Sequence, residues 1–489
     1  MISFLLNDTL QTIEHMAPST CVLDFLRTSM ALTGTKEGCA AGDCGACSVA
    51  VGELKGDQVI YQAINACITP LGSLHGKHLI TVEYLSQKNA LHPVQQAMVS
   101  CHGSQCGFCT PGIIMSLFTW YENVKSGRLD ASRHSVELAL SGNLCRCTGY
   151  QPIFRAAEQA LKLPSTFDSL SALSSLKMIA AAKPGHVSDG QQHFFIPNTL
   201  LDLYALIDAH PNARLVAGAT DLGLEFTQQL KSEAVLIYLG QVRELLELAD
   251  SASALTIGAA CTYKDIHSHL ELYFPAFATL LNRLGSLQIR NQGTLGGNVA
   301  NASPIGDTPP VLLALNAKFH LAGSAGNREV AADDFFSAYR QTQLRPNECL
   351  KAIEIPKLGA DETLKVYKIS KRFDDDISAV CMGLWLKMEG DIVTDCRMGF
   401  GGMAATPMRA SQTEQQLIGQ CFDDATVATA GQALAKEFSP IDDVRATADY
   451  RLAVAASLLK RAQYEMQGGI ATDLFAELPT TLSGGYDHA

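Results

Sequence analysis

Ten of the 15 cysteines fall before Tyr150, and eight of those ten stand in two closely spaced sets. One set combines a C-x2-C pair, Cys106 and Cys109, with a C-x-C pair, Cys145 and Cys147. Each pair runs into a short turn and a proline that can open a helix, so both pairs are expected beside helix N-termini, where free N–H groups favour negative charge. Four thiolates at these spacings suit a sulfide-bridged iron cluster or a tetrahedral zinc ion, and buried free cysteines are a third interpretation.

The other set lies nearer the N-terminus, in the stretch GCAAGDCGAC at residues 38–47. It places Cys39, Cys44 and Cys47 as C-x4-C-x2-C with a distant Cys67, which is the spacing of plant-type [2Fe–2S] ferredoxins. Its glycines allow a short loop to curl round an inorganic core and to direct backbone N–H groups at the sulfurs. Zinc requires no such loop. With this set beside it, the C-x2-C…C-x-C set is interpreted as a second [2Fe–2S] site.

Composition excludes several other classes of function. The 489 residues suggest roughly three or four domains, and a formal net charge of −12 without a basic cluster argues against a nucleic-acid surface. No apolar run approaches the ~18 residues of a membrane span, and the first residues lack the pattern of a signal peptide. We therefore expect a cytoplasmic protein with no membrane or nucleic-acid partner. Clustered cysteines in that reducing compartment indicate metal binding or catalysis rather than disulfides.

Hydrophobic periodicity and turn residues predict a multidomain α+β chain. The expected units are a small α+β domain at 1–87, a helical domain at 88–163, a partly mobile linker at 164–191, a mixed α/β domain at 192–360, an α+β domain at 361–470 and a loose tail at 471–489. Strands are expected at 2–6, 48–54, 58–64 and 78–85, and helices at 94–101, 113–125, 135–140 and 153–161. Thr110 is expected to cap the second of these helices, and Lys371–Asp376 to form a solvated charged loop.

Two glycine-rich stretches in the mixed α/β domain could hold a phosphate. The first, GATDLG, spans residues 218–223, and the second, QIRNQGTLGGNVANASPIGD, spans residues 288–307. Exposed backbone N–H groups and hydroxyls provide the chemistry that a pyrophosphate needs. No G-x-G-x-x-G and no Walker A motif occurs, which excludes the Rossmann and P-loop interpretations, and either stretch alone is more often an ordinary turn.

In this order of motifs the chain resembles the iron–sulfur/FAD subunit of the xanthine dehydrogenase family. The resemblance runs from about residue 2 to 470 and rests on KEGCAAGDCGAC, QCGFCTPG, GNLCRCTGYQPI and LGGNVANASPIGD. It implies a β-grasp [2Fe–2S] ferredoxin domain, a four-helix [2Fe–2S] domain, an FAD-binding domain of the vanillyl-alcohol-oxidase type and a C-terminal α+β domain. The ligand sets that it implies are Cys39, Cys44, Cys47 and Cys67 for one cluster, and Cys106, Cys109, Cys145 and Cys147 for the other.

The resemblance also implies cofactor contacts outside the cysteines. The matching positions for FAD, expected to bind non-covalently, are Leu215, Val216, Ala217, Gly218, Ala219, Thr220, Asp221, Leu222, Leu284, Thr294, Leu295, Gly296, Gly297, Asn298, Asn301, Asp307 and Lys368. In the family, Asp307 would accept from a ribityl hydroxyl and Lys368 would neutralise charge near the flavin. Leu284 stands where the family often places an aromatic residue. Gln105 matches a glutamine that touches the molybdopterin of the catalytic half.

The function implied by the resemblance is an electron relay. Electrons from purine oxidation (hypoxanthine and xanthine to urate) would pass from a molybdopterin-binding large subunit through two [2Fe–2S] clusters to FAD and on to NAD⁺ as co-substrate. The molybdenum site and all catalytic residues are expected on that partner, in a heterotetramer of two copies of each subunit. The alternatives are the matching subunit of an aldehyde, CO or N-heterocycle hydroxylase, and a stand-alone iron–sulfur flavin electron carrier. Gln105 and the flavin motifs argue against the carrier.

Overall fold

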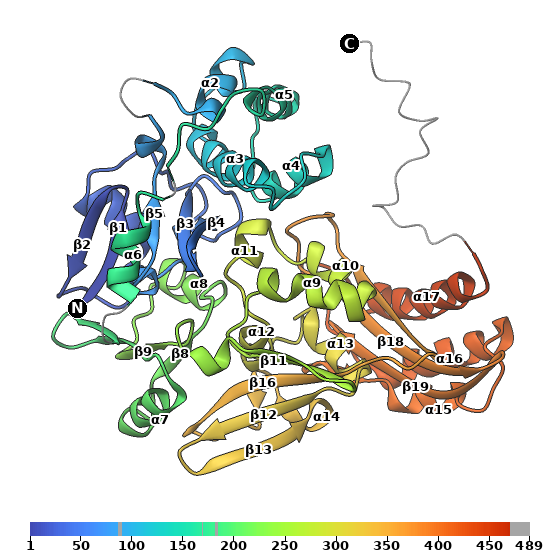
Figure 1. The fold of residues 1–489 in the computed structure, drawn as a ribbon. Helices are drawn as coiled ribbons and strands as arrows, with labels where there is room; N and C mark the ends of the chain where they lie inside the picture. The colour runs from blue at the N-terminus through green and yellow to red at the C-terminus, as the bar shows by residue number, and fades with distance from the viewer. Residues whose placement is uncertain (87–89, 169, 181–183, 470–489) are drawn as a thin grey trace.

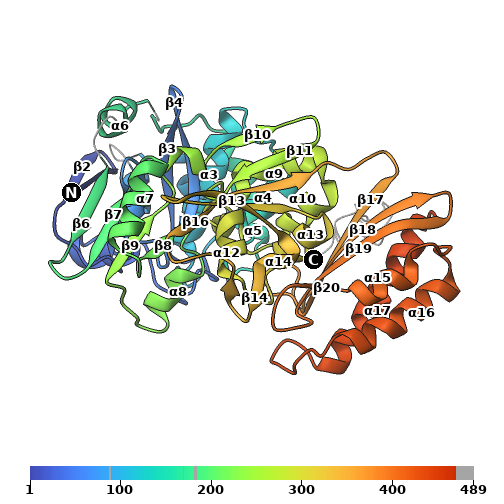
Figure 2. The ribbon, with the colours of Figure 1, turned by 90° about the horizontal axis from the view of Figure 1, so that it is seen from below.

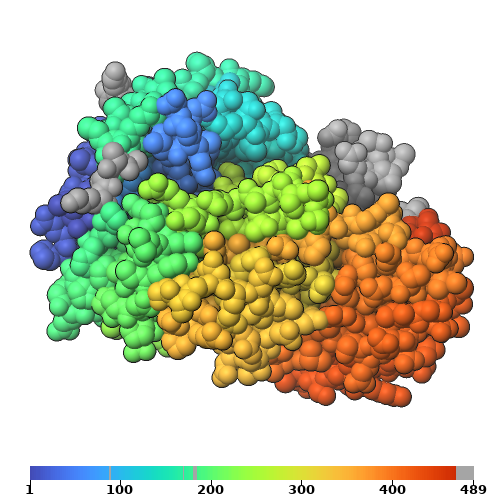
Figure 3. All heavy atoms as spheres, turned by 60° about the horizontal axis from the view of Figure 1, so that its bottom comes forward, coloured from blue at the N-terminus to red at the C-terminus, as the bar shows by residue number. Residues whose placement is uncertain are grey.

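The computed structural model describes residues 1–86, 90–168, 170–180 and 184–469. The N-terminal part (blue and cyan) and the C-terminal part (orange and red) lie on either side of a green and yellow middle part (Figure 1). The same order is visible on the molecular surface in Figure 3. No helix of the described residues combines the length and the apolar character that a membrane crossing requires.

The first unit is a five-stranded mixed sheet in the order β2-β1-β5-β3-β4, with β1 and β5 parallel and the other neighbours antiparallel. Its strands are β1 (Ile2–Leu6), β2 (Thr9–Ile13), β3 (Ser48–Lys55), β4 (Gln58–Asn65) and β5 (His78–Ile80), and helix α1 (Val22–Asp24) packs beside them. The strand expected at 78–85 ends at Ile80, because its pairing with β3 ends there and the chain turns through a 3-10 segment, Val82–Leu85.

Four helices form the second unit: α2 (Pro93–Ser100), α3 (Thr110–Lys125), α4 (Arg133–Leu140) and α5 (Gln151–Ala160). Helix α3 is buried along most of its length, with Phe118 and Trp120 at 2% exposure or less, and it packs against β3 and β4. The expected cap residue Thr110 is instead the first residue of α3, and Cys109 precedes the helix without a side-chain cap. The Thr110 hydroxyl bonds to the Ser104 hydroxyl, which removes it from the capping position.

The stretch expected to be a linker, 164–191, contains two regular elements. Helix α6 (Leu173–Ala180) packs against β1 and β3, and Leu176 is fully buried there. Strand β6 (Gly185–Ser188) pairs with β7 (His193–Ile196) and so begins the next sheet before residue 192. The stretch expected to be a linker therefore contains a helix, because the apolar side chains of Leu176 and Ile179 are spaced for one within a Ser- and Ala-rich composition.

The middle part contains two larger sheets, in the orders β6-β7-β9-β8 and β10-β11-β16-β12-β13, and a short pair β14-β15. Its remaining strands are β8 (Arg214–Val216), β9 (Val235–Tyr238), β10 (Leu248–Asp250), β11 (Ala254–Gly258), β12 (Lys318–Gly323), β13 (Gly326–Ala331), β14 (Phe336–Ala338), β15 (Gln341–Thr342) and β16 (Glu348–Pro356). Its helices are α7 (Leu200–Ala209), α8 (Leu222–Thr227), α9 (Tyr263–Tyr273), α10 (Pro275–Asn282), α11 (Leu287–Arg290), α12 (Leu295–Asn301), α13 (Thr308–Ala314) and α14 (Ala332–Phe335). The first glycine-rich stretch follows β8, and the second contains α12.

The C-terminal part is an antiparallel sheet in the order β17-β18-β19-β20, with α15, α16 and α17 on one face and α13 against β18 and β19 (Figure 2). Its elements are β17 (Glu362–Ile369), β18 (Val380–Glu389), β19 (Ile392–Gly401), β20 (Met408–Arg409), α15 (Ser411–Leu417), α16 (Asp424–Glu437) and α17 (Ala448–Met466). The predicted tail, 471–489, lies outside the described residues.

Candidate functional site

The four cysteines of the ferredoxin-like set meet at one end of the first sheet. Cys47 immediately precedes β3 and Cys67 follows β4, so the hairpin brings their Sγ atoms to 3.3 Å, with both residues at 2% exposure or less. Cys39 and Cys44 lie on the preceding loop, and their thiols hydrogen-bond to each other. The N–H of Ala41 points at Cys39 Sγ from 3.3 Å, which is the backbone-to-sulfur contact expected of such a loop.

The thiols of this set form one hydrogen-bonded chain in the order Cys44, Cys39, Cys67, Cys47. A hydrogen bond from Cys44 lowers the pKa of Cys39, and one from Cys67 lowers the pKa of Cys47, whereas bonding to Cys39 raises the pKa of Cys44 and of Cys67. Since a [2Fe–2S] cluster takes two thiolates on each iron, four neighbouring thiols fit its donor set. Across the described part of the chain, no three His, Cys, Asp or Glu side chains are arranged to hold one metal ion.

The second set is divided between the starts of two helices. Cys106 and Cys109 precede α3, Cys145 and Cys147 precede α5, and the thiols pair as Cys109 with Cys145 and Cys106 with Cys147. Burial, helped by bonding to Cys145, raises the pKa of Cys109 to about 12. The pKa of Cys145 is lowered, because hydrogen bonds from Thr148 outweigh its partial burial.

One end of the second set faces solvent. Cys106 and Cys147 are exposed, as is Gln105, while Cys109 and Cys145 are half-buried. The neighbouring apolar side chains of Phe108 and Leu144 are 46% and 51% exposed. This surface therefore combines exposed thiols with exposed hydrocarbon.

The two cysteine sets are joined by backbone contacts. The N–H of Leu144 donates to the carbonyl of Cys44 at 3.0 Å, and the Asn143 side chain donates to the carbonyl of Gly45 at 3.1 Å. The first turn of α3 also approaches the ferredoxin-type loop, because a Cβ on Gly112 would lie 2.1 Å from the Gly45 carbonyl oxygen. No side chain fits between the two elements at that point.

The two glycine-rich stretches line one cavity of about 460 Å³, a size typical of cofactor sites. The predicted flavin residues that line it are Leu215, Val216, Ala217, Gly218, Ala219, Thr220, Asp221, Leu222, Leu284, Thr294, Gly296, Gly297, Asn298 and Asn301. The stretches meet closely: a Cβ on Gly218 would lie 2.1 Å from the Gln292 carbonyl oxygen, and Ala219 has φ of 58°, in the left-handed region. Their backbone, hydroxyl and amide groups suit the phosphates and hydroxyls of a dinucleotide, and the apolar lining suits its ring system.

Three predicted flavin residues do not line this cavity. Leu295 is fully buried in the core of the middle part. Asp307 and Lys368 form an ion pair of 2.7 Å, and both side chains are 7% exposed or less. The Ser378 hydroxyl donates to the other Asp307 oxygen at 2.5 Å. Thr308, the residue after Asp307, donates its hydroxyl to Asn298 Oδ1 in the cavity lining at 2.7 Å.

The cavity also has lining residues that were not among the predicted flavin contacts. They are Ala213, Arg214, Glu225, Leu239, Ala259, Tyr263, Ile289, Gly293, Ala300, Arg340, Leu344 and Leu350. Arg340 adds a cation near the mouth, 3.8 Å from Asp221, and Asn301 donates to the same carboxylate at 2.8 Å. Most come from elements without a motif, so only the tertiary fold could identify them.

The charged loop Lys371–Asp376 is not simply solvated, contrary to the sequence prediction. Phe373 lies under the Arg283 guanidinium at 4.7 Å, and residues 373–376 are half-buried. Burial, followed by the charge of Asp43, raises the pKa of Asp375 to about 7, while Arg372 and Arg290 oppose that shift. Arginines from the middle part hold this loop, and they lie too far away in sequence for charge pattern to reveal.

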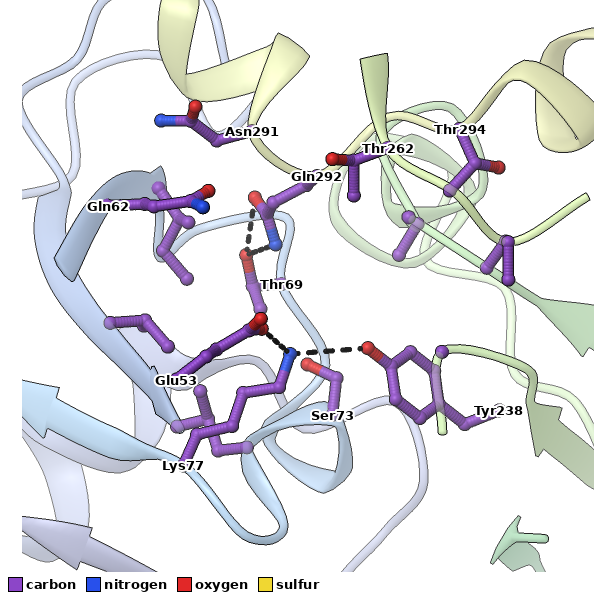
Figure 4. A pocket seen from close by; sticks show the side chains of 18 of the residues that line it. Glu53, Gln62, Thr69, Ser73, Lys77, Tyr238, Thr262, Asn291, Gln292 and Thr294 are labelled. Atoms are coloured by element: carbon purple, nitrogen blue, oxygen red, sulfur yellow. Dashed lines mark hydrogen bonds and ion pairs between the residues drawn. The ribbon is translucent and has the colours of Figure 1, made fainter. Parts of the chain in front are cut away.

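A second, smaller cavity of about 100 Å³ lies between the first sheet and the middle part (Figure 4). Lys77 Nζ lies 2.6 Å from Glu53 and 3.5 Å from the Tyr238 hydroxyl, and the Lys77 charge lowers the pKa of Glu53. Thr69 and Gln292 hydrogen-bond across the same space. The loop 217–219 and Thr294 line this cavity and the larger one, so the two share a wall.

Helix α8 connects the flavin-type cavity to the ferredoxin-type loop. It begins at Leu222, in the cavity wall, and ends at Thr227. The Thr227 hydroxyl donates to the carbonyl of Ala40 at 2.7 Å, and the Gln228 amide donates to the carbonyl of Cys39 at 3.1 Å. A single short element therefore contacts both sites.

Four family models match the chain in sequence order. They are a 2Fe-2S iron-sulfur cluster binding domain at 4–72, a [2Fe-2S] binding domain at 81–158, an FAD binding domain in molybdopterin dehydrogenase at 189–358 and a CO dehydrogenase flavoprotein C-terminal domain at 365–466.

Curated relatives and solved structures agree with these matches. Xanthine dehydrogenase of Drosophila pseudoobscura pseudoobscura is 32% identical over 94% of this chain and 39% of its own length. That of Emericella nidulans is 33% identical over 90% of this chain and 36% of its own length. The chain thus spans about two fifths of these relatives. A carbon monoxide dehydrogenase structure from Hydrogenophaga pseudoflava (TM-score 0.52, 28% identity) covers 54% of this chain and 93% of its own. Quinoline 2-oxidoreductase from Pseudomonas putida 86 (TM-score 0.52, 28% identity) covers 56% and 95%.

Two [2Fe–2S] domains followed by an FAD-binding domain define an electron-transfer module of the molybdenum hydroxylases. The chain belongs to the xanthine dehydrogenase family and corresponds to its iron–sulfur/flavin part. The predicted multidomain α+β fold class and the family resemblance are confirmed.

Proposed function

We propose that this chain carries electrons from a molybdopterin-binding partner through its two cysteine sites to FAD and on to NAD⁺. The observation that supports this is continuity between the sites. The second cysteine set has an exposed end at Cys106, and its backbone bonds to Cys44 through Leu144. The ferredoxin-type loop bonds to the end of α8, whose first residue, Leu222, lines the flavin-type cavity. The sites thus follow one another from the surface to the cavity.

In this proposal each part of the chain has a defined task. Cys39, Cys44, Cys47 and Cys67 hold one [2Fe–2S] cluster, Cys106, Cys109, Cys145 and Cys147 hold the other, and the 460 Å³ cavity holds FAD. The clusters supply one-electron transfer, and the flavin exchanges single electrons for a hydride. Gln105, Phe108 and Leu144 form the docking surface for the partner, because exposed hydrocarbon beside a redox site is best covered by a protein surface.

The substrate class that we propose is the purines: the partner oxidises hypoxanthine and xanthine to urate. The two subunits form a heterotetramer with two copies of each. Support comes from the xanthine dehydrogenases reported above, which align over 90–94% of this chain. The second candidate is a hydroxylase for CO or an N-heterocycle. It is supported by the carbon monoxide dehydrogenase and quinoline 2-oxidoreductase structures, which align over 54–56% of the chain.

The test separates the two halves of the reaction. The chain loaded with FAD and both clusters should pass electrons from NADH to an artificial dye, yet show no activity with xanthine. Adding the molybdopterin-binding partner should give xanthine-dependent NAD⁺ reduction, and quinoline or CO in place of xanthine tests the second candidate. In the complex, Cys106→Ser should abolish the xanthine reaction and keep the NADH-to-dye reaction.

Cys421→Ser is the matched control, since this exposed thiol lies in the C-terminal part. It should leave both reactions intact. Xanthine oxidation by the chain alone, or loss of both reactions in a folded Cys106→Ser complex, would contradict the proposed direction of electron flow.

A further inference from the structure

The segment from Leu284 to Ile289 packs into three different hydrophobic cores. Leu284 packs against the core of the middle part, Leu287 against the core of the four helices, and Ile289 against the core of the ferredoxin-like sheet. Ser286 caps the turn of helix that follows, accepting from the N–H of Ile289 at 3.3 Å. One short segment of the middle part therefore helps to complete three cores.

Polar contacts fix the same segment in place. The Gln288 side chain is fully buried and donates to Ser116 on α3 and to Asn143, each at 2.9 Å. The N–H of Leu287 donates to the Ser141 hydroxyl at 3.2 Å. The position of Ile289 is thus held from the helical domain as well as from its own domain.

Ile289 is the residue of this segment that contacts the ferredoxin-type loop. Its side chain lines the 460 Å³ cavity, and its Cδ1 lies 3.3 Å from the place where a Cβ on Gly42 would be. Ile68, which follows Cys67 in the chain, closes on the same point, with its Cδ1 at 2.6 Å. Two isoleucine side chains therefore meet over Gly42, between the thiols and the cavity.

We propose that Ile289 is a positioning residue that couples the flavin cavity to the ferredoxin-type cluster by filling the space between them with packed hydrocarbon. This inference rests on the proposed function. In the coupled step one electron leaves the reduced cluster and enters the flavin, and two such transfers, with protons taken from solvent, give the reduced flavin that can donate a hydride to NAD⁺. Electrons tunnel faster through packed atoms than across a gap, so a void at this point slows the step.

Polar groups near Ile289 are the reason why the space between the cavity and the ferredoxin-type loop must be filled by hydrocarbon. The polar cavity of Figure 4 lies along the same domain boundary, and Thr69 and Gln292 in its wall are close in sequence to Ile68 and Ile289. A space opened at Ile289 would adjoin those polar groups and could admit water, since water enters a cavity that is roomy and has polar partners.

The experiment uses the full chain loaded with FAD and both clusters. Ile289→Val removes only the Cδ1 methyl that faces Gly42, and Ile289→Ala removes more. Absorbance after flash reduction of the flavin measures the rate of electron exchange between flavin and cluster. This rate should fall in the Ile289→Val variant and should fall severalfold in the Ile289→Ala variant. Flavin content, the reduction potentials of both groups and the rate at which NADH reduces the flavin should stay at wild-type values.

Ile266→Ala is the control, because Ile266 is a fully buried isoleucine that lines neither cavity, whereas Ile289 is partly buried and lines the larger one. It should lower stability without changing the exchange rate. Three results would overturn the inference. They are an equal loss of exchange rate in Ile266→Ala, an unchanged exchange rate in both Ile289 variants, and a shift in reduction potential that accounts for the slower rate. If the wild-type chain bound no flavin or no iron, the proposed function itself would fail, and cofactor content shows this before any variant is compared.

Discussion

The backbone N–H of Leu144 donates a hydrogen bond to the carbonyl of Cys44 at 3.0 Å, so the residue before Cys145 contacts a residue of the other cysteine set. Because the contact is made by backbone, it does not depend on which side chain stands at position 144. The spacing between the two cysteine sets is therefore set by the packing of their loops, and the side chains around this contact determine how rigid that packing is.

Asn143 supports that contact from inside the protein, at 1% exposure. It donates to the Gly45 carbonyl and to the Ser48 hydroxyl and accepts from Gln288. Asn143→Ala should lower the free energy of unfolding by about 2–4 kcal/mol, because it removes three buried hydrogen bonds made by this side chain. Urea unfolding and iron content measure the effect. The exposed Asn327→Ala is the control, and an equally small change in both variants would contradict the role of Asn143.

Because Asp307 and Lys368 form a buried ion pair, we expect the effect of either residue on stability to depend strongly on the presence of the other. Asp307→Ala should destabilise the protein by about 3–5 kcal/mol and lower flavin retention, because it leaves a buried ammonium without its partner. The double variant Asp307→Ala with Lys368→Met should be less destabilised than the sum of the single variants. Thermal unfolding and bound-flavin absorbance test this. Strict additivity would show that the two charges do not stabilise each other.

His78 gives the ferredoxin-like unit a predictable response to acid. Burial lowers the pKa of His78 from 6.5 to about 4, and the ring bonds to the Tyr61 hydroxyl at 2.7 Å and to the Asn7 carbonyl at 2.5 Å. Since the unfolded chain binds the proton more tightly, stability is fully present above about pH 6.5 and is lost as pH falls towards about 4.

From pH 7 to pH 5 this residue should therefore remove about 2 kcal/mol from the free energy of unfolding. Urea unfolding at the two pH values measures the loss. His78→Gln should be less stable at pH 7 but should show a flatter pH dependence. An equal slope in wild type and variant would mean that His78 is not the group responsible.

Gly218→Ala should weaken flavin binding by about tenfold, equivalent to about 1.4 kcal/mol. The added methyl would meet the Gln292 backbone at 2.1 Å, so the two glycine-rich stretches must move apart. Equilibrium titration of the flavin-free protein with FAD gives the dissociation constant. Gly431→Ala on α16 adds the same methyl far from the cavity and should leave the affinity unchanged.

The sequence predicted the parts of this protein that depend on local pattern. The four helices at 93–160 and the loop with Cys39 and Cys44 follow from short spacings, and the structure has them within a few residues of the expected bounds. The two glycine-rich stretches were also recognisable, and they do line one cavity. The ligand and flavin contacts assigned by resemblance stay predictions.

What the sequence could not predict depends on contacts between distant segments. Ile289 and Leu287 belong to a four-residue helix, which is too short for a periodic pattern, and their neighbours come from different domains. The ion pair of Asp307 with Lys368 joins residues 61 positions apart, so nothing near Asp307 shows that its carboxylate already has a partner.

The segment from Leu284 to Ile289 has a consequence for biosynthesis. A chain made from its N-terminus presents both cysteine-bearing domains to the cell before this segment has left the ribosome. Until it arrives, the surface at Gly42 and Ser141 stays uncovered, although every cysteine of the two sets has already been synthesised. The nascent chain therefore has an interval in which the surface at Gly42 and Ser141 is open, and translation of this single later segment ends it.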